Sequence, residues 1–266
     1  AVYEPGACDL DVHAIHQGFL KGVRQHGGAV VCNAPVQVLH HDGLNWQVRT
    51  PAGQWQAPVV VNAAGIWGQR IAEYADLSIR MFPAKGSLLI MDHRINQHVI
   101  NRCRKPSDAD ILVPGDTISL IGTTSQHIDY DDIDSNRVTA EEVDILLREG
   151  EKLAPIMAKT RILRAYSGVR PLVASDDDPT GRNVSRGIVL FDHAQRDGLE
   201  GFITITGGKL MTYRLMAEWA TDLVANKLGN SRPCRTAELN LPGSRDPEKV
   251  SAPGLSVPVE GSAQYR

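Results

Sequence analysis

A strand-to-helix junction at residues 201–214 constrains the fold of this chain more than any other feature. A run of β-type residues ends at the glycine pair Gly207-Gly208, and an amphipathic helix is predicted to begin at Lys209. Two glycines allow the backbone to approach a ligand closely, and the free N–H groups of a first helical turn favour a negative charge. Lys209 lies where the helix dipole disfavours a cation, so solvent or a bound anion must offset its charge. The junction therefore indicates an anion site, although an ordinary turn with an exposed lysine fits the same residues.

Helical and strand-like patterns alternate along the rest of the chain. Apolar residues recur at helical spacing over residues 11–26, and a continuous apolar run at 59–65 predicts a strand buried on both faces of a mainly parallel sheet. Thr139 and Glu142 form a capping box before a helix at 140–153, and Gly229 ends the helix at 209–228. The other predicted strands cover residues 29–39, 46–50, 54–58, 86–91, 111–113, 119–124, 187–191 and 201–206. This order predicts an α/β (α+β) fold.

Composition excludes several classes of protein. The 28 lysines and arginines against 31 acidic residues leave no basic footprint for nucleic acid. The four cysteines form no CxxC pair, so we expect no metal site and no disulfide framework, and a reducing, cytoplasmic compartment fits best. No apolar stretch approaches the roughly 20 residues needed to span a bilayer, so any membrane association is expected to be peripheral.

Three cations stand at the ends of predicted elements in one part of the chain. Arg170 lies among apolar and small residues, where a buried guanidinium requires an anionic or polar partner. That partner is either a ligand or one of the carboxylates at 176–178. Arg186 precedes the strand at 187–191 and also fits a solvated turn. Together, Arg170, Arg186 and Lys209 suit a small phosphorylated or carboxylated substrate.

Residues 57–243 carry a resemblance to a known family. They resemble the large catalytic subunits of anaerobic glycerol-3-phosphate dehydrogenases, within the flavoprotein superfamily that includes D-amino-acid oxidase. The motifs that carry the resemblance are Val59-Val60-Val61-Asn62-Ala63-Ala64-Gly65-Ile66-Trp67-Gly68, Ile121-Gly122-Thr123-Thr124, Tyr166-Ser167-Gly168-Val169-Arg170-Pro171-Leu172 and Gly207-Gly208-Lys209-Leu210-Met211-Thr212-Tyr213-Arg214.

The resemblance implies two domains that the chain enters more than once. It implies a partial FAD-binding Rossmann-like domain and a mixed-sheet substrate domain of the D-amino-acid oxidase type. Residues 1–78 would supply a helix, a β-meander and a strand of the FAD domain, and residues 79–185 the substrate domain. Residues 186–230 would return to the FAD domain with a flavin-contacting helix, and 231–266 would form a linker or the start of a further domain.

The resemblance also implies roles for individual residues. Arg170 matches the arginine that meets the substrate near its reacting carbon, while Arg186 and Lys209 match positions that hold the phosphate. The positions expected to contact FAD are Asn62, Ala63, Ala64, Gly65, Gly207, Gly208, Lys209, Leu210 and Thr212. No histidine falls in a motif that identifies a general base.

The implied reaction is oxidation of sn-glycerol 3-phosphate to dihydroxyacetone phosphate, with hydride transfer from C2 to flavin N5. Electrons would pass through companion subunits to a quinone-linked acceptor, at the inner face of the cell membrane. The FAD cofactor would supply the difficult chemistry, and the protein would supply orientation and charge.

Two departures from the family pattern lead to other expectations. The chain has no Gly-x-Gly-x-x-Gly turn and no cysteine-rich C-terminal region, which predicts a fragment, either catalytically incomplete or acting as an interaction module. Residues 1–56 resemble the amino-acid-oxidase branch more closely, which suggests a mosaic of two relatives. The alternative substrate is therefore a 2-amino or 2-hydroxy acid whose carboxylate binds Arg170.

Overall fold

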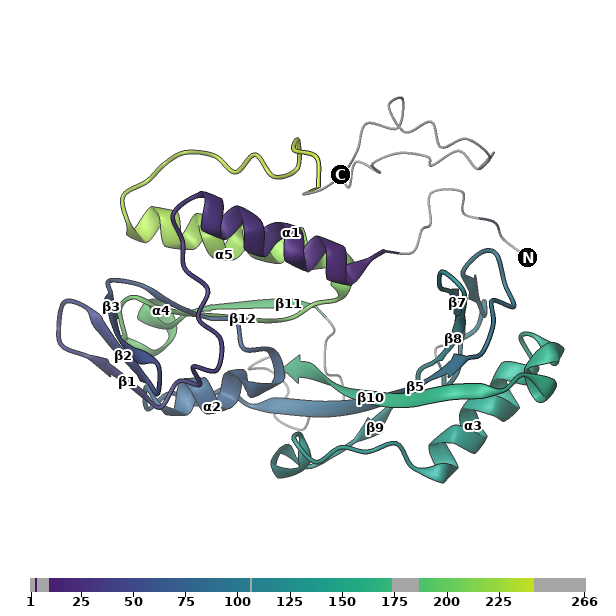
Figure 1. Cartoon of the computed structure of the whole chain (residues 1–266). Coiled ribbons are helices and arrows are strands. Elements are labelled where there is room, and N and C mark those ends of the chain that lie inside the picture. Colours follow the sequence, from purple (N-terminus) through teal and green to yellow (C-terminus); the bar gives the residue numbers. More distant parts are fainter. Residues whose placement is uncertain (1–2, 4–9, 106, 174–186, 242–266) are drawn as a thin grey trace. The chain divides into compact units, whose positions relative to one another are not determined.

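The computed structural model describes residues 3, 10–105, 107–173 and 187–241 (Figure 1). The chain divides into two compact units. Unit 1 contains Ala1–Asp9, Ala63–Val189 and Ile205–Gly208, and unit 2 contains Leu10–Asn62, Leu190–Thr204 and Lys209–Arg266. Of the residues predicted to bind substrate, Arg186 lies outside the described residues, as do the carboxylates at 176–178 and the C-terminal part of the predicted linker.

Unit 2 begins with the helix α1 (Val12–Gln25) and an antiparallel meander of β1 (Val38–His41), β2 (Trp46–Thr50) and β3 (Gly53–Ala57). Trp46 joins the meander to the rest of the unit. Its buried ring packs on Phe202, with ring centroids 5.1 Å apart, and its indole N–H donates to the carbonyl of Glu200 at 3.0 Å. The unit also holds α4 (His193–Asp197) and α5 (Tyr213–Lys227).

A short parallel pairing supports the residues predicted to contact the cofactor. The strands β11 (Ile188–Asp192), β12 (Phe202–Gly207) and β4 (Val60–Asn62) form a sheet in the order β11-β12-β4. β12 and β4 run parallel, with Thr204 opposite Asn62. The carboxyl ends of both strands therefore meet at one edge of this sheet, where ligands of α/β proteins commonly bind.

Unit 1 is built on a sheet in the order β10-β5-β8-β7-β6, with β9 also paired to β5. All of these pairings are antiparallel. The strands are β5 (Met81–Met91), β6 (Ile100–Asn101), β7 (Ile111–Pro114), β8 (Ser119–Gly122), β9 (Gln126–His127) and β10 (Ile162–Val173). The helices of the unit are α2 (Gly68–Glu73) and α3 (Ala140–Glu151). Single 3-10 turns cover Gly65–Trp67, Tyr130–Asp132 and Pro155–Lys159.

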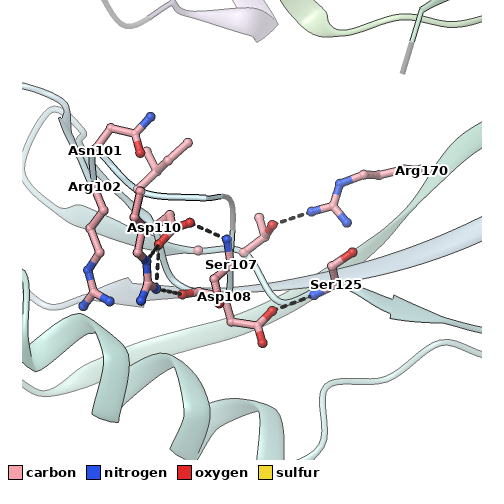
Figure 2. A pocket seen from close by; sticks show the side chains of 11 residues that line it. Asn101, Arg102, Ser107, Asp108, Asp110, Ser125 and Arg170 are labelled. Carbon is pink, nitrogen blue, oxygen red and sulfur yellow. Dashed lines mark hydrogen bonds and ion pairs between the residues drawn. The ribbon is translucent and has the colours of Figure 1, made fainter. Parts of the chain in front are cut away.

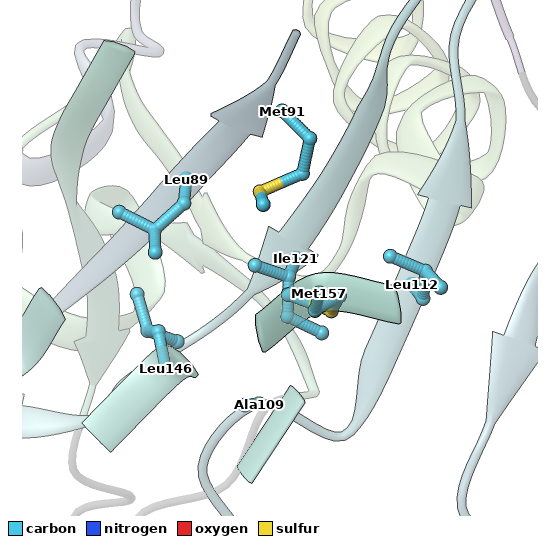
Figure 3. Packing of buried hydrophobic residues seen from close by; sticks show 7 residues of the cluster. All are labelled: Leu89, Met91, Ala109, Leu112, Ile121, Leu146 and Met157. Carbon is cyan, nitrogen blue, oxygen red and sulfur yellow. The ribbon is translucent and has the colours of Figure 1, made fainter. Parts of the chain in front are cut away.

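The two faces of β5 have different roles because successive side chains of a strand point to opposite faces. Leu89 and Met91 belong to a buried cluster that includes Leu146 of α3, and Figure 3 shows Leu89 facing Leu146. The other members of this buried cluster are Ala109, Leu112, Ile121 and Met157. The even-numbered residues of β5, including Gly86, lie on the opposite face, which leaves that face available for a site.

A buried carboxylate joins α3 to this sheet. Glu142 is fully buried and accepts hydrogen bonds from Lys85 Nζ at 2.7 Å and from Ser87 Oγ at 2.7 Å. It also accepts from Thr124 Oγ1 at 3.0 Å and from the Thr139 N–H at 2.9 Å, and the latter bond completes the predicted capping box. Burial raises the pKa of Glu142, but the hydrogen bonds from Lys85, Thr139, Ser87 and Thr124 outweigh it and lower the pKa to about 2.

Several predicted elements are confirmed and others are wrong. The helices predicted at 11–26 and 140–153 match α1 and α3 closely. Residues 29–37, predicted as part of a strand, are not a strand, and pairing starts only at Val38. The strand predicted at 59–65 is shorter, covering Val60–Asn62, and it is not buried on both faces, since Val61 is 40% exposed. Among the described strands, β4 pairs only with β12.

The Glu142→Gln variant tests the buried carboxylate. The pKa of Glu142 is lowered from 4.5 to about 2, so its ionisation stabilises the fold above pH 4.5 and this contribution is lost as the pH falls toward 2. We expect the variant to be less stable at pH 7 by roughly 3 kcal/mol, and the difference from wild type to shrink as the pH falls from 5 toward 2. Urea unfolding across this range measures both quantities.

The matched control is Glu141→Gln, at the exposed neighbouring position of the same helix. It should leave the curve of stability against pH close to wild type. If the stability difference between Glu142→Gln and wild type stayed constant between pH 5 and pH 2, this result would contradict the assigned role of the ionised carboxylate.

Candidate active site

Arg170 lies on β10 and projects from the face of the sheet opposite to α3. Its Nη2 donates to Thr123 Oγ1 and, at 3.4 Å, to the carbonyl oxygen of Thr124. Both acceptors belong to the segment that follows β8. Arg170 is directly opposite Ala84 on β5, so Gly86 is its diagonal neighbour on the same face. The sequence predicts a ligand or one of the carboxylates at 176–178 as the partner of Arg170, and this stays a prediction. Among the described residues, Thr123 and Thr124 accept hydrogen bonds from it.

Arg170 lines a polar cavity of about 530 Å³, and Figure 2 shows the side chains around it. This volume falls within the range of small-molecule sites. Arg102 and Arg104 also line the cavity, but each is already paired with a carboxylate, at 2.8 Å to Glu149 and at 2.7 Å to Asp110. The remaining lining residues are Asn101, Ser107, Asp108, Asp110, Ile111, Gly122, Thr123 and Ser125.

The acceptors of Arg170 are held from the other side of the sheet. The Thr124 hydroxyl donates to Glu142 at 3.0 Å and accepts from the Ser87 N–H at 2.9 Å. The backbone N–H of Thr124 in turn donates to the Ser87 carbonyl at 3.2 Å. Buried polar groups with several partners are rigid, so the position of the Thr124 carbonyl beside Arg170 is well defined.

At the end of β4, the predicted cofactor residues combine one buried side chain with exposed backbone. The Asn62 side chain is buried and donates from Nδ2 to Thr204 Oγ1 at 3.3 Å. Thr204 also contacts Nε2 of the buried His193 at 2.9 Å, and Nδ1 of this ring contacts Asp197 at 2.5 Å. Ala63, Ala64 and Gly65 follow Asn62. Gly65 has φ +58°, and no atom lies within 4 Å of the position that a Cβ would take.

The glycine pair at the end of β12 adopts the left-handed conformation, with φ +71° at Gly207 and +69° at Gly208. The structure corrects the predicted start of the following helix. A 3-10 turn, Leu210–Thr212, precedes α5, which begins at Tyr213 rather than at Lys209. The Lys209 N–H donates to Thr212 Oγ1 at 3.0 Å, and the Gly208 N–H donates to the Gly187 carbonyl at 2.8 Å. These two N–H groups are therefore already paired.

The predicted site residues fall in both units of the chain. Arg170, Ala63, Ala64, Gly65, Gly207 and Gly208 belong to unit 1, whereas Asn62, Lys209, Leu210 and Thr212 belong to unit 2. The grouping of Arg170, Arg186 and Lys209 around one substrate therefore stays a prediction. Sequence reasoning missed Gly86, Thr123 and the pocket residues Arg102 and Arg104. The only available signal was the Ile121-Gly122-Thr123-Thr124 motif, which places two hydroxyls after a strand.

Two kinds of feature are absent from the described part of the chain. Residues 3, 10–105, 107–173 and 187–241 contain no group of three or more metal-binding side chains. Within the same residues, no helix has both the length and the apolar character needed to cross a membrane.

Comparison with known proteins extends these observations. The model of the FAD dependent oxidoreductase family matches residues 1–214. The chain is 72% identical over 266 residues to a subunit of the anaerobic glycerol-3-phosphate dehydrogenase of Escherichia coli (strain K12), covering 99% of this chain and 46% of that relative. The chain thus spans about half the length of this relative. Because the alignment includes nearly all of residues 1–56, no mosaic of two relatives is needed to explain them.

Two solved structures share the fold. Glycine oxidase from Geobacillus kaustophilus has a TM-score of 0.60 at 22% identity, over 83% of this chain and 55% of that one. The L-α-glycerophosphate oxidase from Mycoplasma pneumoniae, solved with FAD bound, has a TM-score of 0.60 at 15% identity, over 85% of this chain and 57% of that one.

The Gly207→Ala variant tests the glycine pair. A side chain at φ +71° is strained, and its Cβ would also collide with the Gly187 carbonyl oxygen. Gly229→Ala is the matched control, because Gly229 has φ +70° with nothing within 4 Å of a Cβ. We expect the control to lose about 1–2 kcal/mol of stability from strain alone, and Gly207→Ala to lose at least about 2 kcal/mol more. Urea unfolding measures both losses; equal losses would show that the Gly187 carbonyl does not restrict this position.

Proposed function

Because this chain belongs to the FAD-dependent oxidoreductase family, we propose that it forms part of the catalytic core of a glycerol-3-phosphate dehydrogenase. The proposed reaction is oxidation of sn-glycerol 3-phosphate at C2, which gives dihydroxyacetone phosphate. The name of the relative that is 72% identical to this chain supports the choice of substrate.

One observation carries the proposal: Arg170 is fixed in a polar cavity of about 530 Å³, a size suited to a small anionic substrate. Its guanidinium would orient the substrate near C2 and stabilise negative charge that develops there. We assign phosphate binding to Lys209 and Arg186. The Lys209 side chain is exposed and forms no ion pair with any described residue.

The residues after β4 and β12 fit a bound FAD. Gly65 leaves open space beside its backbone, and the turn after Gly207-Gly208 exposes apolar side chains, with Leu210 54% exposed and Met211 68% exposed. Asn62, Ala63, Ala64 and Gly65 would lie near the diphosphate and ribose, while Gly207, Gly208, Lys209, Leu210 and Thr212 would contact the flavin. The chemistry that FAD supplies when bound is acceptance of the hydride equivalent at N5.

The proposal extends to partners and location. The relative is named as one subunit of its enzyme, so companion subunits are part of the proposal, with a quinone-linked acceptor reached through them. Association with the inner face of the cell membrane would then be peripheral and on the cytoplasmic side. The alternative substrate, a 2-amino or 2-hydroxy acid, would use Arg170 for its carboxylate but would leave Lys209 and Arg186 without an anion.

A substrate panel tests the proposed reaction. The FAD-loaded protein is mixed without oxygen with sn-glycerol 3-phosphate, glycerol, glycine or lactate, and flavin absorbance is recorded. We expect bleaching only with glycerol 3-phosphate, because glycerol lacks the phosphate and the acids lack the matching arrangement of anion and hydroxyl. Bleaching by glycine or lactate instead would establish the alternative.

Variants of Arg170 test its role in the same assay. We expect Arg170→Ala to lower kcat/KM for glycerol 3-phosphate by roughly 10²–10³-fold, because a positioned charge-assisted donor is lost. Arg170→Lys should recover part of this loss, since it keeps the charge without the planar fork. Arg164→Ala is the control, an exposed arginine six residues away on the same strand. An Arg170→Ala enzyme as active as this control would exclude Arg170 from the site.

A further inference from the structure

We propose that Gly86 and Thr123 are positioning residues that fix the Arg170 guanidinium in the pocket before substrate binds. Gly86 provides the surface against which the guanidinium lies, and Thr123 provides the acceptor that holds its Nη2. The substrate named in this inference, glycerol 3-phosphate, rests on the proposed function. The placement of the guanidinium by Gly86 and Thr123 does not.

The contact with Gly86 is a close approach between a strand backbone and a side chain. A Cβ built on Gly86 would lie 2.8 Å from both Cζ and Nη1 of Arg170, closer than real Cβ atoms come, and would collide with Nη2 as well. All three atoms at the end of the guanidinium therefore occupy the space that a side chain at position 86 would fill. Any residue larger than glycine must displace the guanidinium.

The sheet itself does not require glycine at position 86. Gly168 on β10 pairs directly with Gly86, and no atom lies within 4 Å of a Cβ built at Gly168. Neither glycine has the positive φ that would demand this residue. The two members of this cross-strand pair differ in what covers them, because the Arg170 guanidinium lies over the buried Gly86 and open space lies over the exposed Gly168.

Thr123 holds the guanidinium from a second direction. Its hydroxyl accepts from Nη2, and the neighbouring Thr124 carbonyl accepts from the same nitrogen at 3.4 Å. Thr124 is anchored to the buried Glu142, so the acceptors are fixed to α3 through the sheet. An arginine held in this way loses little freedom when an anion binds, which increases affinity without a new contact.

The first test compares Gly86→Ala with Gly168→Ala in the FAD-loaded enzyme. We expect Gly86→Ala to raise KM for sn-glycerol 3-phosphate about tenfold or more at unchanged FAD content, because the guanidinium is displaced. Gly168→Ala should stay within about twofold of wild type, a difference too small to indicate a lost interaction. Equal effects of the two substitutions, or an unchanged KM in Gly86→Ala, would overturn the role of Gly86.

A second pair of variants keeps the test decisive if Gly86→Ala fails to fold. Thr123→Val removes the acceptor at nearly constant volume, and Thr123→Ser retains it. We expect Val to raise KM about tenfold and Ser to restore it to within about threefold, a difference in keeping with the loss of a hydrogen bond to a charged group. Equal KM values for Val and Ser would remove Thr123 from this role.

Crystal structures of the same variants give a readout that needs no substrate. The guanidinium should leave its position beside Thr123 in Gly86→Ala and keep it in Gly168→Ala. An undisplaced guanidinium in Gly86→Ala would overturn the inference even if the enzyme oxidises glycerol 3-phosphate. A displaced guanidinium would support it even if the true substrate is a different anion, so the two proposals fail separately.

Discussion

The candidate site depends on the ionised carboxylate of Glu142, which lies buried between α3 and the sheet of unit 1. Burying a charge is costly unless donors replace water, and here the Lys85 ammonium, two hydroxyls and a backbone N–H do so. The four donors come from β5, from the segment after β8 and from the N-cap residue of α3. One side chain thus fixes three segments of the chain at a single point. Loss of the carboxylate would leave Lys85 as an uncompensated buried cation.

The alternation of side chains along β5 carries this constraint to the face of the sheet that bears Arg170. Lys85 and Ser87 face Glu142, while Gly86 between them faces Arg170. Thr124 completes the connection, because its hydroxyl bonds to the carboxylate and its carbonyl accepts from the guanidinium. The hydrogen bonds around Glu142 and the pocket that Arg170 lines therefore lie on opposite faces of the same sheet and are connected through Thr124. A change beneath the sheet is expected to move the arginine above it.

Patterns of neighbouring residues in the sequence predicted local structure such as helix starts. They could not predict contacts between residues that lie far apart in the chain. The capping box of Thr139 and Glu142 correctly marked the start of α3, because both partners lie within one turn. Nothing local in the sequence shows that Lys85, 57 positions away, reaches Glu142. The partners of Arg170 likewise lie 47 and 46 positions away. The residues before Val38 contain apolar side chains suited to a strand, but pairing with β2 begins only at that residue.

The glycine pair Gly207-Gly208 marks the end of a strand, as the sequence predicts, but the backbone after it differs from the predicted helix start. From sequence, free N–H groups of a first helical turn were expected to bind an anion, with Lys209 opposed to the helix dipole. The helix begins only at Tyr213, after a 3-10 turn, and the N–H groups of Gly208 and Lys209 already have acceptors. An anion at this turn could therefore use the exposed Lys209 ammonium, which precedes the helix, but not the N–H groups of Gly208 and Lys209. The two glycines turn the chain at the end of β12 with positive φ, and the N–H of Gly208 bonds within the protein to the Gly187 carbonyl instead of being left for a ligand.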